Sequence, residues 1–162
     1  MENESNVLPV RGRNAIEILV NDHQVIKGLL QELTEASAKK QRKDVLERLK
    51  GALTIHNATE ENIVYPAINR VARKRAEAEH LYHETAEADI LVFELDTLLK
   101  VGEDSKFVAK AKKFHSAVLQ HIENEETSAF PHLQEKADQN QSKMLTDSVR
   151  AFRNSVHFNE PA

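Results

Sequence analysis

The segment His56-Asn-Ala-Thr-Glu-Glu-Asn-Ile-Val-Tyr-Pro66 occurs a second time in the chain, as His121-Ile-Glu-Asn-Glu-Glu-Thr-Ser-Ala-Phe-Pro131. Both copies follow the pattern H-x-x-x-E-E-x-x-x-[YF]-P, and every position of the second copy lies 65 residues after its counterpart, since 121 − 56 = 65. Two copies of one segment at a constant separation indicate that the chain is built from two similar halves. Each half is predicted to be a helical hairpin.

Apolar residues at helical spacing lead into both copies of the segment and recur in two further stretches. Steps of three and four residues are typical of the inner face of a helix in a bundle. The four stripes are Leu19, Ile26, Leu30 and Leu33; Leu46, Leu49 and Leu53; Leu91, Leu95 and Leu98; and Phe107, Ala111, Phe114 and Val118. We therefore predict an all-α fold: an up-down antiparallel four-helix bundle over residues 14–135, with a short additional C-terminal helix over 139–157. Residues 1–13 are polar, contain Pro9 and Gly12, and are expected to form a flexible N-terminal arm.

Composition excludes several classes of function. The 162 residues contain no cysteine, which rules out disulfides, thiolate metal sites and cysteine nucleophiles. The 22 basic and 26 acidic residues are interspersed, whereas a nucleic-acid-binding protein needs a basic surface. The sequence shows neither a membrane-length apolar run nor a signal peptide. We expect a cytoplasmic protein, a monomer or homodimer, with no nucleic-acid or membrane partner.

The repeated segments place chemically active side chains on the inner stripes. His56 and Glu60 are four residues apart, as are His121 and Glu125, so each pair shares one helix face. Buried carboxylates are costly and repel each other, and metal cations bound between them and the imidazoles would remove both difficulties. His23 lies on the first helix's stripe and can complete such a site from a third side. These five residues are predicted metal ligands.

The third helix offers two further candidates, His80 and His83, which are three residues apart and share a face. Projection at the helical period places His80 nearer the stripe of Leu91 and Leu95. The half-repeat instead favours His83, because its distance to the following H-x-x-x-E motif is closer to the distance from His23 to His56. We keep both as predicted metal ligands.

The predicted donors are all nitrogen and oxygen, a set that suits iron or manganese and that zinc also binds. Seven donor residues exceed the four ligands of a usual zinc site, and two carboxylates able to bridge imply a pair of metal ions. A dinuclear iron centre fits best, with manganese or zinc as substitutes. Tyr65 is expected to be a core aromatic residue that can donate a hydrogen bond near the site. Glu61 and Glu126 point about 100° away from the ligating glutamates and are expected to contact solvent or support the ligands.

With these motif residues the sequence resembles the hemerythrin/HHE cation-binding family. The resemblance covers roughly residues 14–133. The family pattern has a histidine on helix one, H-x-x-x-E on helix two, a histidine on helix three, and H-x-x-x-E/D on helix four. It falls here on His23; on His56 and Glu60; on His80 or His83; and on His121 and Glu125. The resemblance implies a four-helix bundle with a non-haem diiron centre bridged by the two carboxylates and an oxo or hydroxo group.

Members of that family carry or sense oxygen, handle iron, or react with nitric oxide or peroxide. The spacing of three between His80 and His83, and the glutamate four residues after His121, differ from oxygen-carrying hemerythrins and place this chain with the broader bacterial-type HHE proteins. The resemblance thus implies a protein that binds a small diatomic or peroxidic ligand in a redox, oxygen-sensing or stress role. Two alternatives are a diiron enzyme that disproportionates peroxide or acts as an oxidase, and an iron-storage or iron-sensing module. A ferritin-like diiron bundle would need two Glu-x-x-His motifs, and only Glu77 with His80 has that spacing.

Overall fold

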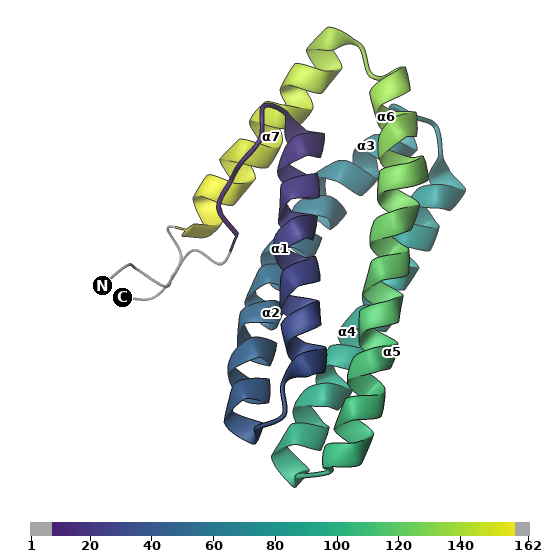
Figure 1. The fold of residues 1–162 in the computed structure, drawn as a ribbon. Helices are drawn as coiled ribbons and strands as arrows, with labels where there is room; N and C mark the ends of the chain where they lie inside the picture. The colour runs from purple at the N-terminus through teal and green to yellow at the C-terminus, as the bar shows by residue number, and fades with distance from the viewer. Residues whose placement is uncertain (1–7, 158–162) are drawn as a thin grey trace.

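The computed structural model describes residues 8–157, and its regular structure over this range is entirely helical (Figure 1). Four long helices run up and down beside one another: α1 (Ala15–Glu35), α2 (Lys39–Thr59), α4 (Arg75–Val101) and α5 (Asp104–Asn124). The last helix, α7 (Gln139–His157), packs against α1 and α2. The predicted all-α bundle with an additional C-terminal helix is confirmed.

Two of the bundle helices continue through a wider turn into a short further helix. After α2 come the π-helical segment η1 (Glu60–Val64) and α3 (Tyr65–Arg70); after α5 come η2 (Glu125–Ala129) and α6 (Phe130–Lys136). The sequence repeat is therefore also a structural repeat.

The prolines at the ends of the repeated segments explain the π turns. A proline inside an α-helix lacks the N–H group, and its ring clashes with the carbonyl group four residues earlier. In η1 the backbone widens, so that the N–H of Tyr65 donates to the carbonyl of Glu60, five residues back. In η2 the N–H of Phe130 donates to Glu125 in the same way. Each wide turn begins with a candidate metal-ligating glutamate.

Local signals in the sequence define two of the helix ends. The side chain of Asn14 accepts a hydrogen bond from the Glu17 N–H at 3.0 Å and caps α1. Gly102 ends α4 with a left-handed φ of 77°, a conformation that costs glycine little. Residues 1–7 of the expected arm lie outside the described residues. Leu8, which also belongs to that expected arm, is buried in the core.

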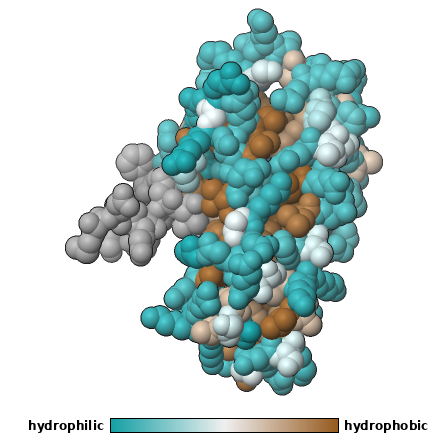
Figure 2. Space-filling view, in the orientation of Figure 1, coloured by the Kyte–Doolittle hydropathy of each residue, from teal (hydrophilic) through white to brown (hydrophobic). Residues whose placement is uncertain are grey.

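The core consists of two apolar clusters separated along the bundle axis. One cluster fills the end with the α1–α2 and α4–α5 connections and includes Leu30, Leu46, Leu95 and Phe114. The other lies among α3, α6, α7 and the adjacent helix ends, and includes Tyr65 and Phe130. The polar residues of the repeated segments lie between the two. Figure 2 shows a largely hydrophilic surface, with apolar side chains visible mainly in the seams between helices.

Within residues 8–157, no helix combines the length and apolar character needed to cross a membrane.

Candidate metal centre

Five of the predicted metal ligands meet between the two apolar clusters, and all five are buried. The helix α1 supplies His23, while α2 supplies His56 and its continuation η1 begins with Glu60. The helix α5 supplies His121, and η2 begins with Glu125. One ligand atom from each of four of them, namely His23, His56, Glu60 and Glu125, lies within 4.8 Å of the others.

The distances within this cluster are those of side chains that face a common centre. His56 Nε2 lies 3.0 Å from Glu60 Oε1, and His121 Nε2 lies 3.3 Å from Glu125 Oε1. His23 Nε2 lies 3.1 Å from Glu125 Oε2 and 3.8 Å from Glu60 Oε1. Each histidine thus turns its Nε2 atom towards the carboxylates of the two repeated segments.

Although these distances are short, the angles give three of the inward-facing atoms no hydrogen bond among residues 8–157: His23 Nε2, Glu60 Oε1 and Glu125 Oε2. A buried polar atom without a partner is destabilising unless something else satisfies it. The three atoms converge, and they are imidazole nitrogen and carboxylate oxygen, which bind first-row transition metals. The arrangement therefore fits a metal-ion site.

The outer nitrogen of each histidine is bound by a carboxylate from a neighbouring helix. His56 Nδ1 lies 3.1 Å from Asp22 Oδ2, and His121 Nδ1 lies 2.8 Å from Glu84 Oε2. His23 Nδ1 lies 2.7 Å from Glu126 Oε1, so that of the two roles expected for Glu126 it has the one that supports a ligand. In metal sites such carboxylates fix the ring orientation and leave the other nitrogen free to bind the ion.

The pKa values of the buried imidazoles and of Glu60 are shifted in directions that balance the charge in this cluster. Burial acts to lower the pKa of His121, but hydrogen bonds to Glu125 and Glu84 outweigh it and raise the pKa to about 10. The pKa of His23 also stands well above its usual value, against the effect of burial, because carboxylates surround the ring. Burial acts to raise the pKa of Glu60, yet the neighbouring imidazoles hold it well below its usual value. Protons on the imidazoles thus do what metal cations would do: they neutralise the buried carboxylates.

Tyr65 contributes a sixth polar group to the cluster. Its hydroxyl oxygen lies 2.7 Å from Glu125 Oε1, 3.0 Å from Glu60 Oε2 and 3.1 Å from His121 Nε2. Burial and the two carboxylates raise the pKa of Tyr65 well above its usual value, so the hydroxyl keeps its proton. The sequence predicts that Tyr65 lies near the site but not that it lies at the centre. In an α-helix it would lie about 140° around the axis from Glu60, and the π turn removes that separation.

The structure does not bring His80 and His83 to the cluster. Their side chains are 62% and 71% exposed, and they pair with Glu84 and Glu87 on the surface of α4. The buried stripe of α4 passes through Leu81, and His80 and His83 lie about 100° and 200° around the helix from it.

The physical reason for this placement is the path of the stripe along α4. Its buried residues are Ala78, Leu81, Thr85, Ala88, Leu91, Leu95 and Leu99, so that six steps cover 21 residues, an average of 3.5. That spacing is typical of helices in a left-handed bundle, where it keeps one seam facing the partner helices. The stripe includes Leu99, whereas Leu98, used in the sequence projection, is only partly buried.

Thr85 occupies the place on α4 that His23 occupies on α1. Asp22 binds the outer nitrogen of His56, and the next residue, His23, faces the centre; Glu84 binds the outer nitrogen of His121, and the next residue is the buried Thr85. The two halves of the molecule therefore differ at the centre. One half supplies three of the five converging residues, and the other supplies two.

Comparison with known families supports this assignment independently. The model of the hemerythrin HHE cation-binding domain matches residues 14–133, a span that holds α1 through most of α6 and all five converging residues. A comparison with curated proteins finds no match. Both the matched span and the buried histidine–glutamate cluster point to non-haem metal binding. The chain belongs to the hemerythrin HHE cation-binding domain family.

Proposed function

We propose that this protein is a non-haem diiron protein that binds a small ligand, such as O₂, NO or peroxide, in a redox, oxygen-sensing or stress role within the cytoplasm. The observation that carries the proposal is the buried cluster of His23, His56, His121, Glu60 and Glu125. Three of its inward atoms, His23 Nε2, Glu60 Oε1 and Glu125 Oε2, converge without a hydrogen-bond partner within the described chain. Manganese and zinc can occupy the same donor set.

The donor set supports a pair of ions with room for an additional ligand. Three imidazoles offer three nitrogens, and two carboxylates offer four oxygens. The two carboxylates come from opposite halves of the repeat, which suits them to bridge two ions. With no histidine from α4 at the centre, the protein supplies fewer donors than two iron ions ordinarily bind. Coordination positions are thereby left for a small molecule.

The surrounding residues have roles of their own. Bound iron would supply redox chemistry and positions for a diatomic or peroxidic ligand. The chain holds the three imidazoles in fixed orientation through carboxylates on their outer nitrogens. The apolar clusters on both sides of the centre exclude water. Phe130, for example, stacks on the ring of His23 with 5.9 Å between ring centroids.

One observation favours a second function, a diiron enzyme that disproportionates peroxide or acts as an oxidase. The hydroxyl of Tyr65 is a buried proton donor within hydrogen-bond distance of Glu60, Glu125 and His121. Cleavage of peroxide or oxidation of a substrate moves protons between reacting groups, and a buried hydroxyl held at a defined position can take part in that transfer.

The test is the response of the iron-loaded, reduced protein to the three ligands, followed by absorption spectroscopy. We expect a spectral change on adding O₂, NO or peroxide that is absent in the Glu60→Ala/Glu125→Ala variant. A reversible change supports the binding protein. Catalytic oxygen evolution from peroxide, lost in Tyr65→Phe, supports the enzyme. Iron uptake without any response to the three ligands would contradict both and leave iron storage or sensing.

A further inference from the structure

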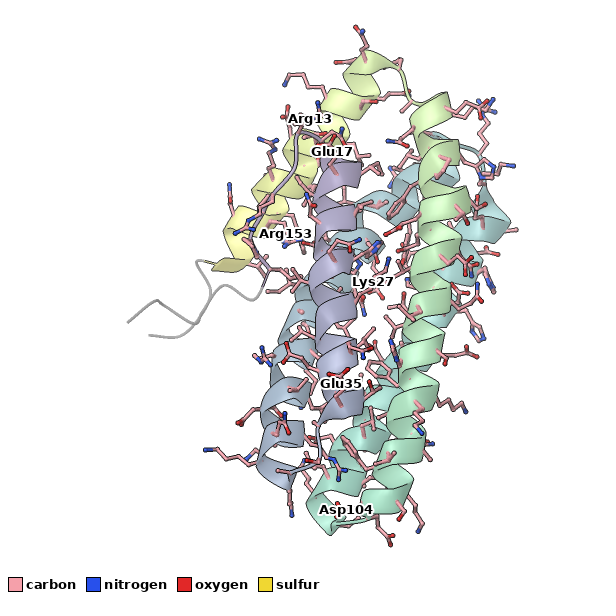
Figure 3. All side chains as sticks on the ribbon, viewed as in Figure 1. Arg13, Glu17, Lys27, Glu35, Asp104 and Arg153 are labelled. Carbon is pink, nitrogen blue, oxygen red and sulfur yellow. The ribbon has the colours of Figure 1, made fainter. Side chains whose placement is uncertain are left out.

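The largest fully buried side chain of the described residues belongs to Arg153, on α7. Figure 3 labels it where α7 passes α1. Its guanidinium group binds both oxygens of Asp22, with Nη1 2.6 Å from Oδ2 and Nη2 3.2 Å from Oδ1. Nη2 also donates to the carbonyl of Leu8 at 3.0 Å. A two-pronged pair of this kind holds a carboxylate in one plane.

Asp22 in turn binds a residue of the candidate metal centre. Its Oδ2 lies 3.1 Å from His56 Nδ1, while His56 Nε2 lies 3.0 Å from Glu60 on the inner side. Arg153, Asp22 and His56 therefore form a continuous chain of contacts from α7 to the centre, and all three are buried. The matched family span ends at residue 133, so Arg153 belongs to a part of this chain outside that span.

A helix that only covered the bundle would not need this arginine. Val149 on the same face of α7 is fully buried and supplies apolar packing. Arg150 holds α7 against the segment that precedes α1 by donating hydrogen bonds to the carbonyls of Gly12 and Arg13, at 3.0 and 3.2 Å. A buried charge is expensive and is usually no better for stability than an apolar residue of the same volume. Packing of α7 on the bundle therefore does not explain why Arg153 is buried in a pair with Asp22.

We propose that α7 is part of the metal centre and that Arg153 is a positioning residue for it. The inference rests on the proposed function. Arg153 fixes the plane of the Asp22 carboxylate, and Asp22 fixes the ring of His56 with Nε2 directed at the metal. Because coupling between two sites is reciprocal, bound iron also strengthens the docking of α7.

The experiment loads the full-length protein with ferrous iron under anaerobic conditions and measures the rate at which an excess of chelator removes it. Arg153→Met removes the charge and both donors and keeps most of the side chain's length. We expect it to release iron about 10- to 100-fold faster than the wild type, the usual effect of losing a group that supports a metal ligand. Arg153→Lys, which keeps the charge but not the two-pronged contact, should fall between them.

Arg150→Met is the matched control, because it also loosens α7 but does not touch Asp22. Its iron release should stay within about twofold of the wild type, as for most surface substitutions. Equal acceleration in Arg150→Met and Arg153→Met would overturn the proposal, since docking of α7 alone would then explain the effect.

A double-mutant cycle tests whether Arg153 acts through Asp22. If it does, Asp22→Asn/Arg153→Met releases iron no faster than Asp22→Asn alone. Accelerations that multiply would contradict the chain of contacts. The double variant leaves no unpaired buried charge, so it and Arg153→Lys carry the test if Arg153→Met fails to fold.

Hydrogen exchange gives an independent readout of the reciprocal effect. Iron should slow exchange of the amides of residues 139–157 in the wild type and in Arg150→Met, but not in Arg153→Met. If the wild type takes up no iron, the proposed function fails, and the role of Arg153 fails with it. If it holds iron while all variants release it and exchange alike, only the role of Arg153 fails.

Discussion

At the scale of single residues, the centre is defined by groups that would be unfavourable anywhere else in the core. Glu60 and Glu125 are fully buried, and one oxygen of each, Glu60 Oε1 and Glu125 Oε2, has no hydrogen-bond partner among the described residues. Without a metal, protons on the imidazoles compensate their charge, and the hydroxyl of Tyr65 lies within hydrogen-bond distance of one oxygen of each. The carboxylates on the outer nitrogens hold the imidazole rings in place.

The contribution of Tyr65 can be measured in the metal-free protein. Tyr65→Phe removes a hydroxyl on which Glu60, Glu125 and His121 converge. It should lower the free energy of unfolding by about 1–3 kcal/mol, the cost of leaving a buried acceptor unsatisfied. Urea unfolding at neutral pH measures this change.

Tyr82→Phe is the control for that measurement. The Tyr82 hydroxyl donates to the carbonyl of Glu61 at 2.7 Å, but the side chain is exposed. Its loss should change the free energy of unfolding by less than about 0.5 kcal/mol. Equal losses in Tyr65→Phe and Tyr82→Phe would show that the buried hydroxyl does not compensate the carboxylates.

At the scale of helices, the spacing of residues decides which side chains reach the centre. On α1, α2 and α5 the inner stripe could be followed from the sequence, and His23, His56 and His121 lie where that stripe predicts. Two features could not be predicted from an ideal helix. The 3.5-residue path on α4 turns Leu81 and Thr85 inward in place of His80 and His83, and the π turn brings Tyr65 beside Glu60.

The orientation of α4 predicts that its histidines do not hold the metal. His80→Ala/His83→Ala should bind as much iron as the wild type, because both side chains face solvent. Iron per chain after loading and desalting measures this. His121→Ala is the positive control and should lose iron. Loss of iron in the double variant, comparable to that in His121→Ala, would mean that α4 rotates to place a histidine at the centre.

At the scale of the whole molecule, two similar halves meet at one centre. The repeat at an offset of 65 residues predicted the bundle and four of the five converging residues, because each half carries the same H-x-x-x-E motif. The C-terminal helix was also predicted, but its connection to the centre was not. A buried arginine that pairs with an aspartate 131 residues earlier leaves no periodic signal in the sequence.

Because the centre joins α1, α2 and α5, bound metal should stabilise the entire bundle. Iron that binds only the folded chain adds about 2.7 kcal/mol to the free energy of unfolding at a free concentration 100 times its dissociation constant. Thermal unfolding with and without ferrous iron under anaerobic conditions measures the shift. The midpoint should rise in the wild type and stay unchanged in Glu60→Ala/Glu125→Ala. An equal rise in both would place the bound iron elsewhere on the protein.

The most direct test of a dinuclear centre is the stoichiometry of iron in the loaded and desalted protein. Two carboxylates from opposite halves of the repeat, with three imidazoles, predict about two iron ions per chain. That number should fall below one in Glu60→Ala/Glu125→Ala. It should remain unchanged in Glu123→Gln, which changes an exposed glutamate of α5 two residues after His121. A wild-type protein that holds less than one iron ion per chain, with no further loss in the double variant, would rule out a diiron centre at these residues.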